Sequence, residues 1–249
     1  MANISTANSG AEAEKPLAGG VALVTGGGRG IGKAIAQRLA KLGAAVSICG
    51  RNEESLMSTA QELRALGVRV HAQTADVTRT GDIAPLVEST EKELGPITIL
   101  MNNAGIGGFG PVHEKSEEEW DRVLNTNLKS VFLVSRAVVP GMIRRGGGDI
   151  INISSLAGKN TFAGGGIYCA SKWGLQGLSG CMAEDLRGYG IRVSVICPGS
   201  VATEFSGSGP KDPKKVLTAR DVAHAVGMVA VQGPQSFISE VHLRPVRKP

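Results

Sequence analysis

Two residues with complementary chemistry lie four positions apart in the segment YCASK, namely Tyr168 and Lys172. On a helix this spacing places both side chains on the same face. An ammonium beside a phenol favours the phenolate and lowers the pKa of the phenol, so such a pair can take part in proton transfer. Surface helices also produce this spacing by chance. The pair alone therefore leaves a proton-transfer site and ordinary helix packing both open.

A second candidate site is the glycine-rich segment TGGGRGIG at residues 25–32. It lies between a predicted strand and a predicted helix, where backbone N–H groups and the positive end of the helix can face a pyrophosphate. Its pattern is T-G-x-x-x-G-x-G, which differs from the G-x-G-x-x-G of many dinucleotide-binding folds. The alternative is a glycine-rich turn that binds no ligand.

The segment after the second predicted strand bears on the choice of nucleotide. A carboxylate about 20 residues beyond the glycine motif binds the ribose 2′-OH of NAD in such folds. This chain has Gly50 there, followed by Arg51, and Arg29 lies inside the glycine segment. A guanidinium matches a phosphate group in shape and charge. These residues favour NADP over NAD, unless both arginines are simply solvated loop residues.

The elements that must position these residues alternate along the chain. Short aliphatic runs are separated by segments with apolar residues at helical spacing, and two helix starts, Ser116 with Glu119 and Thr218 with Asp221, match a capping pattern. This alternation predicts an α/β fold: a Rossmann-like, doubly wound, seven-stranded parallel sheet with helices on both faces. The predicted strands are residues 21–26, 45–50, 68–76, 97–105, 149–155, 191–199 and 239–245.

Composition narrows the class of protein further. The chain has 249 residues and 42% hydrophobic residues, which suits one globular domain, predicted here for residues 18–249 after a flexible tail at residues 1–17. The tail lacks the apolar core of a signal peptide, and no apolar run reaches the roughly 20 residues that span a membrane. The net charge is +5, but no basic block is interleaved with aromatic residues, so we expect no nucleic-acid partner. We expect a cytoplasmic protein.

Cysteine and histidine spacing predicts no metal site. The four cysteines show no C-x-x-C pair, so reduced thiols are expected, and the four histidines are scattered without ligand spacing.

Together these motifs resemble the short-chain dehydrogenase/reductase family, from about residue 18 to residue 243, and most closely its 3-oxoacyl-[acyl-carrier-protein] reductase branch. The resemblance is specific because the motifs occur in one order, each at a predicted strand end or the adjoining helix. The matching segments are TGGGRGIG, ADV (75–77), NNAG (102–105), NTNLKS (125–130), ISS (153–155), YCASK and PGSVAT (198–203).

The resemblance implies an NADP(H)-dependent oxidoreductase that acts on CH–OH or C=O groups. Asp76 and Val77 would flank the adenine, and Pro198 to Thr203 would hold the carboxamide end of the nicotinamide. The full set of implied cofactor-binding residues is Gly26, Gly28, Arg29, Gly30, Ile31, Gly32, Arg51, Asp76, Val77, Asn103, Ala104, Gly105, Tyr168, Lys172, Pro198, Gly199, Val201 and Thr203.

Four residues would form the implied catalytic set. Tyr168 would donate a proton to the carbonyl oxygen, and Lys172 would hydrogen-bond the nicotinamide ribose. Ser155 would orient the carbonyl; Ser154 is its rival, and the family pattern favours the second serine. Asn127, on the preceding long helix, would hold a water that relays protons to Lys172, although a helix-interior asparagine can also bond its own backbone.

The substrate is less well defined by the sequence. A 3-oxoacyl thioester, reduced to the 3-hydroxyacyl product as in fatty acid biosynthesis, is the first expectation, with acyl carrier protein as a partner. Two departures from the family pattern limit this expectation. Tyr189 stands where a basic residue that serves the carrier is usual, which weakens the expectation of carrier docking. The segment that usually forms a helical lid over the substrate, residues 206–217, looks short and turn-rich. Arg187, Arg144 and Arg145 could contribute to docking.

Two other functions stay open. A dehydrogenase of a sugar or other small alcohol would use the same residues, and a non-catalytic protein that senses NADP(H) would need only the glycine segment and Arg51. The resemblance further implies a homotetramer or homodimer that pairs the fourth and fifth predicted helices, near Trp173.

Overall fold

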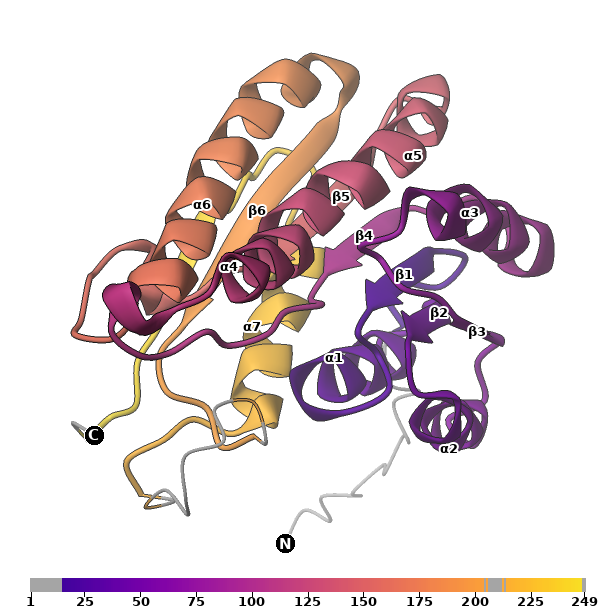
Figure 1. Ribbon diagram of the computed structural model, residues 1–249. Coiled ribbons are helices and arrows are strands. Elements are labelled where there is room, and N and C mark those ends of the chain that lie inside the picture. The colour runs from indigo at the N-terminus through magenta and orange to yellow at the C-terminus, as the bar shows by residue number, and fades with distance from the viewer. Residues whose placement is uncertain (1–14, 204, 206–211, 213, 248–249) are drawn as a thin grey trace, which may run out of the picture.

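The strands form one parallel sheet. The computed structural model describes residues 15–203, 205, 212 and 214–247. Within them the sheet has seven strands in the order β3-β2-β1-β4-β5-β6-β7 (Figure 1). Every neighbouring pair is parallel, which confirms the predicted doubly wound fold. The strands are β1 (Val21–Thr25), β2 (Ala45–Gly50), β3 (Val70–Thr74), β4 (Ile99–Asn102), β5 (Gly148–Ile153), β6 (Ile191–Pro198) and β7 (Glu240–Leu243).

Helices cover both faces of this sheet. One apolar cluster joins the sheet to α1, α2 and α7, and a second joins it to α3, α5 and α6, so that Figure 1 shows the strands between two helical layers. The helices are α1 (Gly30–Lys41), α2 (Glu53–Arg64), α3 (Thr80–Leu94), α4 (Glu117–Leu124), α5 (Ser130–Arg145), α6 (Gly166–Leu186) and α7 (Ala219–Ala230). Short helical segments are η1 (Val112–Glu114), η2 (Asn125–Lys129), η3 (Leu156–Gly158) and η4 (Arg187–Tyr189).

Strand order creates a binding edge. The chain runs outward from β1 to β3 on one side and from β4 to β7 on the other, so the direction reverses between β1 and β4. Ligands of doubly wound sheets bind at the carboxyl ends of the strands near this reversal. All the predicted motifs that follow strands therefore meet along one edge.

Helix starts follow the predicted capping chemistry. The Ser116 hydroxyl accepts a hydrogen bond from the Glu119 N–H at the start of α4. Thr218 and Asp221 form a complete capping box at α7, in which each side chain bonds the backbone of the other residue. Such caps satisfy N–H groups that have no partner within the helix.

The long helix predicted around Asn127 is interrupted. Residues Asn125–Lys129 form a π-helical segment between α4 and α5. A π-segment inserts an extra residue into a helical turn and often occurs at functional sites. Asn127 lies in this segment, and its exposed fraction is 1%.

Leu17, the last residue of the predicted tail, contacts the domain. The Leu17 N–H donates to the Leu42 carbonyl, and Leu17 packs against the apolar cluster of α1 and α7. Residues 1–14 of the predicted tail lie outside the described residues. Among the helices of the described part of the chain, none has the length and apolar character needed to cross a bilayer.

Candidate active site

A large cavity opens at the carboxyl edge of the sheet. Its volume is about 1510 Å3, and the loops after β1 to β6 line it. Ser155 and every predicted cofactor-binding residue contribute to its wall. Asn127 does not line it. The structure thus brings together residues from six separate segments of the sequence.

The glycine loop owes its shape to close backbone contacts. Gly30 adopts a φ of +54°, a left-handed conformation that favours glycine. A Cβ at Gly32 would lie 2.1 Å from the Gly26 carbonyl oxygen and 2.5 Å from Nδ2 of Asn103. Any side chain at Gly32 would therefore push the loop away from the start of α1.

The start of α1 is suited to an anion. Its N-cap residue is Arg29, whose guanidinium has no acceptor atom, and the first turn contains no acidic residue. The N–H groups and dipole at this end favour negative charge. These features fit a pyrophosphate held by the glycine loop.

Positive charge gathers at the outer end of the cavity. Arg51 is exposed directly after β2, and Arg29 lines the same cavity. A Cβ on Gly50 would meet only the Leu56 side chain, at 3.7 Å or more, so the position is open. Burial would raise the pKa of Asp76, but hydrogen bonds from Thr78 and the charge of Arg51 outweigh it and lower that pKa.

The loop after β4 is tied to the glycine loop by an asparagine and a threonine. Asn103 Nδ2 donates to the carbonyl oxygens of Thr25 and Gly26, at 2.9 Å and 3.3 Å. The Thr25 hydroxyl accepts from the N–H groups of Asn103 and Ala104, at 3.0 Å and 3.1 Å. Thr25 was not among the predicted site residues. Its position at the start of the glycine segment was the only signal.

Tyr168 is buried at the inner end of the cavity. Only 8% of its surface is exposed, and burial raises its pKa to about 12, while a hydrogen bond with Ser155 opposes this shift. The expectation of a lowered pKa rested on the Lys172 ammonium together with the positive ring of the oxidised nicotinamide. In the protein alone, loss of solvent around the phenol outweighs the other effects.

Lys172 lies below the tyrosine ring. Its Nζ is 5.8 Å from the ring centroid and donates to the Ile153 carbonyl at 2.9 Å. Its exposed fraction is 4%, and burial lowers its pKa to about 8. The predicted helical pairing of the two residues is therefore present, as a cation–π contact.

Ser155 and Ser154 point to different partners. The hydrogen bond of Ser155 with Tyr168 places its hydroxyl on the cavity side. The Ser154 hydroxyl accepts from Gln176 Nε2 at 3.2 Å and is 3% exposed. Of the two serines, Ser155 is the one beside the phenol.

The Asn127 side chain holds the loop after β4. Its Oδ1 accepts from the Ile106 N–H at 2.8 Å, and its Nδ2 donates to the Ile106 carbonyl at 2.9 Å and to the Ser171 hydroxyl at 3.0 Å. The amide therefore does not bond its own helix, which was the alternative interpretation, and the role of Asn127 in a water relay to Lys172 stays a prediction. Ser171 lies one residue before Lys172, so Asn127 also supports that part of α6.

Three phenylalanines lie at the same end of the cavity as the tyrosine, and none of them was a predicted site residue. Phe109, Phe162 and Phe205 line the same cavity. The Phe109 and Phe205 ring centroids lie 5.2 Å and 5.8 Å from that of Tyr168. The available signal was that Phe109 and Phe162 each stand in a glycine-rich loop of a chain with few aromatic residues.

A polar cluster lies beside the cavity at the end of the sheet. Glu240 Oε1 is 3.2 Å from Cys197 Sγ, 3.1 Å from His242 Nε2 and 2.9 Å from Lys159 Nζ. Three potential metal ligands thus lie within 4.8 Å of one another, which the sequence-based interpretation missed. Because the Lys159 ammonium already neutralises Glu240, we interpret the cluster as a hydrogen-bond network that joins β6, β7 and the loop after η3.

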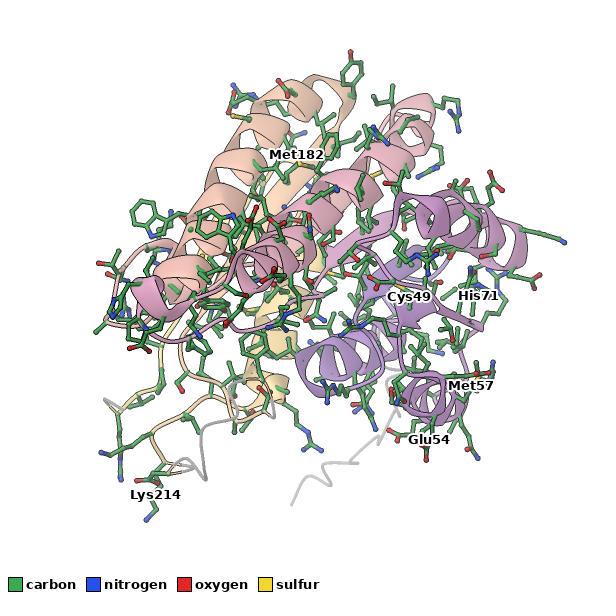
Figure 2. The ribbon with its side chains drawn as sticks, in the orientation of Figure 1. Cys49, Glu54, Met57, His71, Met182 and Lys214 are labelled. Carbon is green, nitrogen blue, oxygen red and sulfur yellow. The ribbon has the colours of Figure 1, made fainter. Side chains whose placement is uncertain are left out.

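Other predicted features lie away from the cavity. Arg144 and Arg145 end α5, and Arg187 precedes β6, which places all three at the amino edge of the sheet, opposite the cavity. None of the three lines the cavity of this chain. His71 lies on β3 and contacts Gln73 and Ser89, and Figure 2 shows it on the opposite side of the molecule from α6.

All four cysteines are free. Cys49, Cys169 and Cys197 are buried, as expected for core thiols, whereas Cys181 is exposed on α6. The segment at residues 206–217, predicted to be a short substrate lid, lies mostly outside the described residues.

The fold and this site define a Rossmann-like oxidoreductase. The model of the short chain dehydrogenase family matches residues 20–214. The chain therefore belongs to the short-chain dehydrogenase/reductase family, which confirms the resemblance found in the sequence.

Relatives and solved structures agree with this assignment. The chain is 38% identical to ketoacyl reductase HetN of a Nostoc species over 215 residues, which cover 84% of this chain and 75% of that protein. It is 40% identical to gluconate 5-dehydrogenase of Gluconobacter oxydans over 190 residues, covering 76% and 74%. A metagenomic short-chain oxidoreductase solved in complex with NADP superimposes with a TM-score of 0.83 at 42% identity, covering 93% of this chain and all of that one.

Proposed function

We propose that this protein is an NADPH-dependent carbonyl reductase that converts a 3-oxoacyl thioester to the 3-hydroxyacyl product. The observation that carries the proposal is the arrangement of Tyr168, which is hydrogen-bonded to Ser155 and lies over Lys172 in a cavity lined by a glycine loop and two arginines. Ketoacyl reductases among the relatives support the thioester substrate.

The cofactor would occupy the cavity from its charged outer end to Tyr168. The glycine loop and the start of α1 would hold the pyrophosphate, because both present N–H groups and a positive dipole. Arg51 and Arg29 would bind the 2′-phosphate of NADP, and the absence of a carboxylate at Gly50 removes the residue that would repel it. A solved relative is a complex with NADP, which supports this choice. When bound, NADPH supplies the hydride for the carbonyl carbon.

Tyr168 would supply the proton. The reduced carbonyl oxygen is an alkoxide, a much stronger base than a phenolate, so a phenol with a raised pKa can still protonate it. A pKa of about 12 also keeps the hydroxyl protonated at neutral pH, as a donor must be. Ser155 would position the carbonyl oxygen, since its hydroxyl already contacts the phenol.

Lys172 and Asn127 would act behind the tyrosine. Lys172 stays charged below about pH 8 and would stabilise the negative charge that forms on Tyr168. Asn127 would position this machinery by fixing Ile106 and Ser171. Its Nδ2 uses both of its donors, whereas Oδ1 accepts one hydrogen bond and keeps a second lone pair that could receive a relay water.

One substitution tests the central role. Tyr168→Phe should abolish NADPH oxidation with acetoacetyl-CoA while leaving NADPH binding within about twofold, because only the proton donor is lost. Tyr189→Phe is the matched control, since Tyr189 is exposed on η4. Retention of most of the activity by Tyr168→Phe would contradict the assigned role.

A dehydrogenase of a sugar or small alcohol is a second candidate, and the gluconate 5-dehydrogenase relative favours it. It would use the same residues in the opposite direction. A panel of 3-oxoacyl thioesters, sugar acids and simple ketones assayed with NADPH or NADP separates the two. Binding of NADPH without turnover of any compound would instead favour a redox sensor.

The proposal includes a cytoplasmic homotetramer or homodimer. Phe132 on α5 and Trp173 on α6 are 46% and 50% exposed, which suits a subunit contact on this helical layer. Sedimentation equilibrium would measure the oligomeric state, and a monomer would contradict this part.

A further inference from the structure

Aromatic side chains gather at one end of the cavity. The chain has five phenylalanines, and three of them line this site. The ring centroids of Phe109 and Phe162 are 6.2 Å apart, and Phe109 is 5.2 Å from Tyr168 with its plane tilted by 57°. These separations are typical of interacting aromatic pairs. The packing of the sheet does not explain them, because Phe109 and Phe162 remain 38% and 50% exposed.

Glycines hold the two exposed rings in place. The Gly110 N–H donates to the Gly164 carbonyl at 2.8 Å, which links the loop after β4 to the loop before α6. A Cβ on Gly107 would lie 2.7 Å from the Phe109 ring, and a Cβ on Gly165 would lie 2.7 Å from the Phe162 ring. Each ring therefore folds back onto a glycine in its own loop. Both rings thus pack against glycine backbone and still face solvent.

The two ends of the cavity differ in polarity. The arginines, Asp76 and the glycine loop follow β1, β2 and β3, whereas Phe109, Phe162 and Phe205 follow β4, β5 and β6. The order of the sheet places these two groups of loops on opposite sides of the reversal point. A charged dinucleotide fits the first end. The second end is left for the carbonyl substrate, and it presents apolar rings.

We propose that Phe109 and Phe162 select carbonyl substrates that carry an aryl or similarly flat apolar group on the carbonyl carbon. This inference rests on the proposed function and specifies its substrate class. The carbonyl oxygen must reach the Tyr168 hydroxyl, so the group beside it lies against Phe109, whose ring already contacts that tyrosine. An aryl group would cover the exposed faces of both phenylalanines, and a methyl group would leave them in water.

The test compares two ketones that differ only in this group, ethyl benzoylacetate and ethyl acetoacetate. With NADPH, we expect wild-type kcat/KM to be at least about tenfold higher for the aryl compound. Phe109→Ala and Phe162→Ala should each lower this ratio about three- to tenfold, chiefly through KM for the aryl compound. Phe237→Ala is the matched control, because Phe237 is 37% exposed and outside the cavity. It should leave the ratio unchanged.

A Phe109→Leu variant separates ring contact from simple bulk. It should also lower the ratio, because leucine fills space without offering an aromatic face. A wild-type kcat/KM ratio near one would overturn the inference, and so would a ratio that stays unchanged in both alanine variants. In either case, reduction of ethyl acetoacetate would leave the proposed function intact. Failure to reduce any carbonyl compound would overturn both.

Discussion

Replacing Lys172 by methionine should stabilise the folded protein at neutral pH while abolishing turnover. Lys172 is 4% exposed, and burial lowers its pKa from 10.5 to about 8. A shift of this size means that burying the ammonium costs the folded state about 3 kcal/mol. Loss of the hydrogen bond to the Ile153 carbonyl offsets about 1 kcal/mol of the gain. We expect the variant to be more stable than wild type by about 2 kcal/mol at pH 7.

The pH dependence of the stability difference between wild type and Lys172→Met is a sharper test than the difference at one pH. Between pH 8 and 10.5 the unfolded chain keeps the Lys172 proton and the folded protein has lost it. Stability therefore rises with pH in this window as the folded state is relieved of the buried charge. From pH 7 to about pH 9.5 the wild type should gain about 2 kcal/mol relative to Lys172→Met. Tyr168 acts in the opposite direction, but only above pH 10, where the unfolded phenol ionises first.

Urea unfolding without dinucleotide, at fixed protein concentration and a series of pH values, would measure these differences. Lys92→Met, the same chemical change at an exposed lysine of α3, is the matched control and should follow the wild-type pH dependence. Parallel stability curves for wild type and Lys172→Met across pH 7 to 9.5 would show that Lys172 is not held as a buried ammonium.

Two further substitutions probe the cofactor end of the cavity. Arg51→Asp should shift the ratio of NADPH to NADH affinity toward NADH by at least about tenfold, because it replaces the cation beside the 2′-phosphate with a carboxylate; an unchanged ratio measured by cofactor titration would contradict the assignment. Gly32→Ala should weaken NADPH binding by at least about tenfold, because the new Cβ would lie 2.1 Å from the Gly26 carbonyl oxygen. Gly177→Ala, at a helical glycine with no atom within 4 Å of the added Cβ, should leave binding unchanged, and equal effects of the two would refute the steric argument.

Local patterns in the sequence were sufficient to predict the sheet and most of the cavity. Strands such as VALVT are continuous apolar runs that end at a glycine or polar residue, and parallel pairing brings these ends to one edge. The π-helical turn at Asn127 could not be read in this way, because a shift from i+4 to i+5 bonding leaves the apolar pattern almost unchanged. The sequence placed Asn127 on a helix, and only the structure shows that its amide holds Ile106.

Contacts between distant segments account for what the sequence missed. Cys197 and His242 are register partners on β6 and β7, so their meeting with Glu240 depends on how two strands align. A buried network from Asn102 to Asn152 and on to Ser179 similarly joins β4, β5 and α6, at 2.9 Å for each bond. Polar residues inside apolar runs were the only hint of these contacts. The pKa of Tyr168 likewise depends on side chains brought together by folding, which no local pattern records.

Burial acts on Tyr168 and Lys172 in opposite senses, and both effects suit reduction. Desolvation raises the pKa of the phenol and lowers that of the ammonium, because each group is pushed toward its neutral form. At neutral pH the phenol is thus held as a proton donor beside the Lys172 ammonium. That ammonium is still charged, because neutral pH lies about one unit below its pKa of about 8. When the phenol gives up its proton, the new phenolate and Lys172 attract each other with little solvent between them, so the ammonium becomes harder to deprotonate. A phenol with a pKa of about 12 would exchange poorly with solvent alone, so we expect its proton to be replaced through the neighbouring ammonium. Oxidation in the reverse direction would need the phenolate as base; burial in the protein alone disfavours that form, whereas the positive nicotinamide ring of bound NADP+ would favour it.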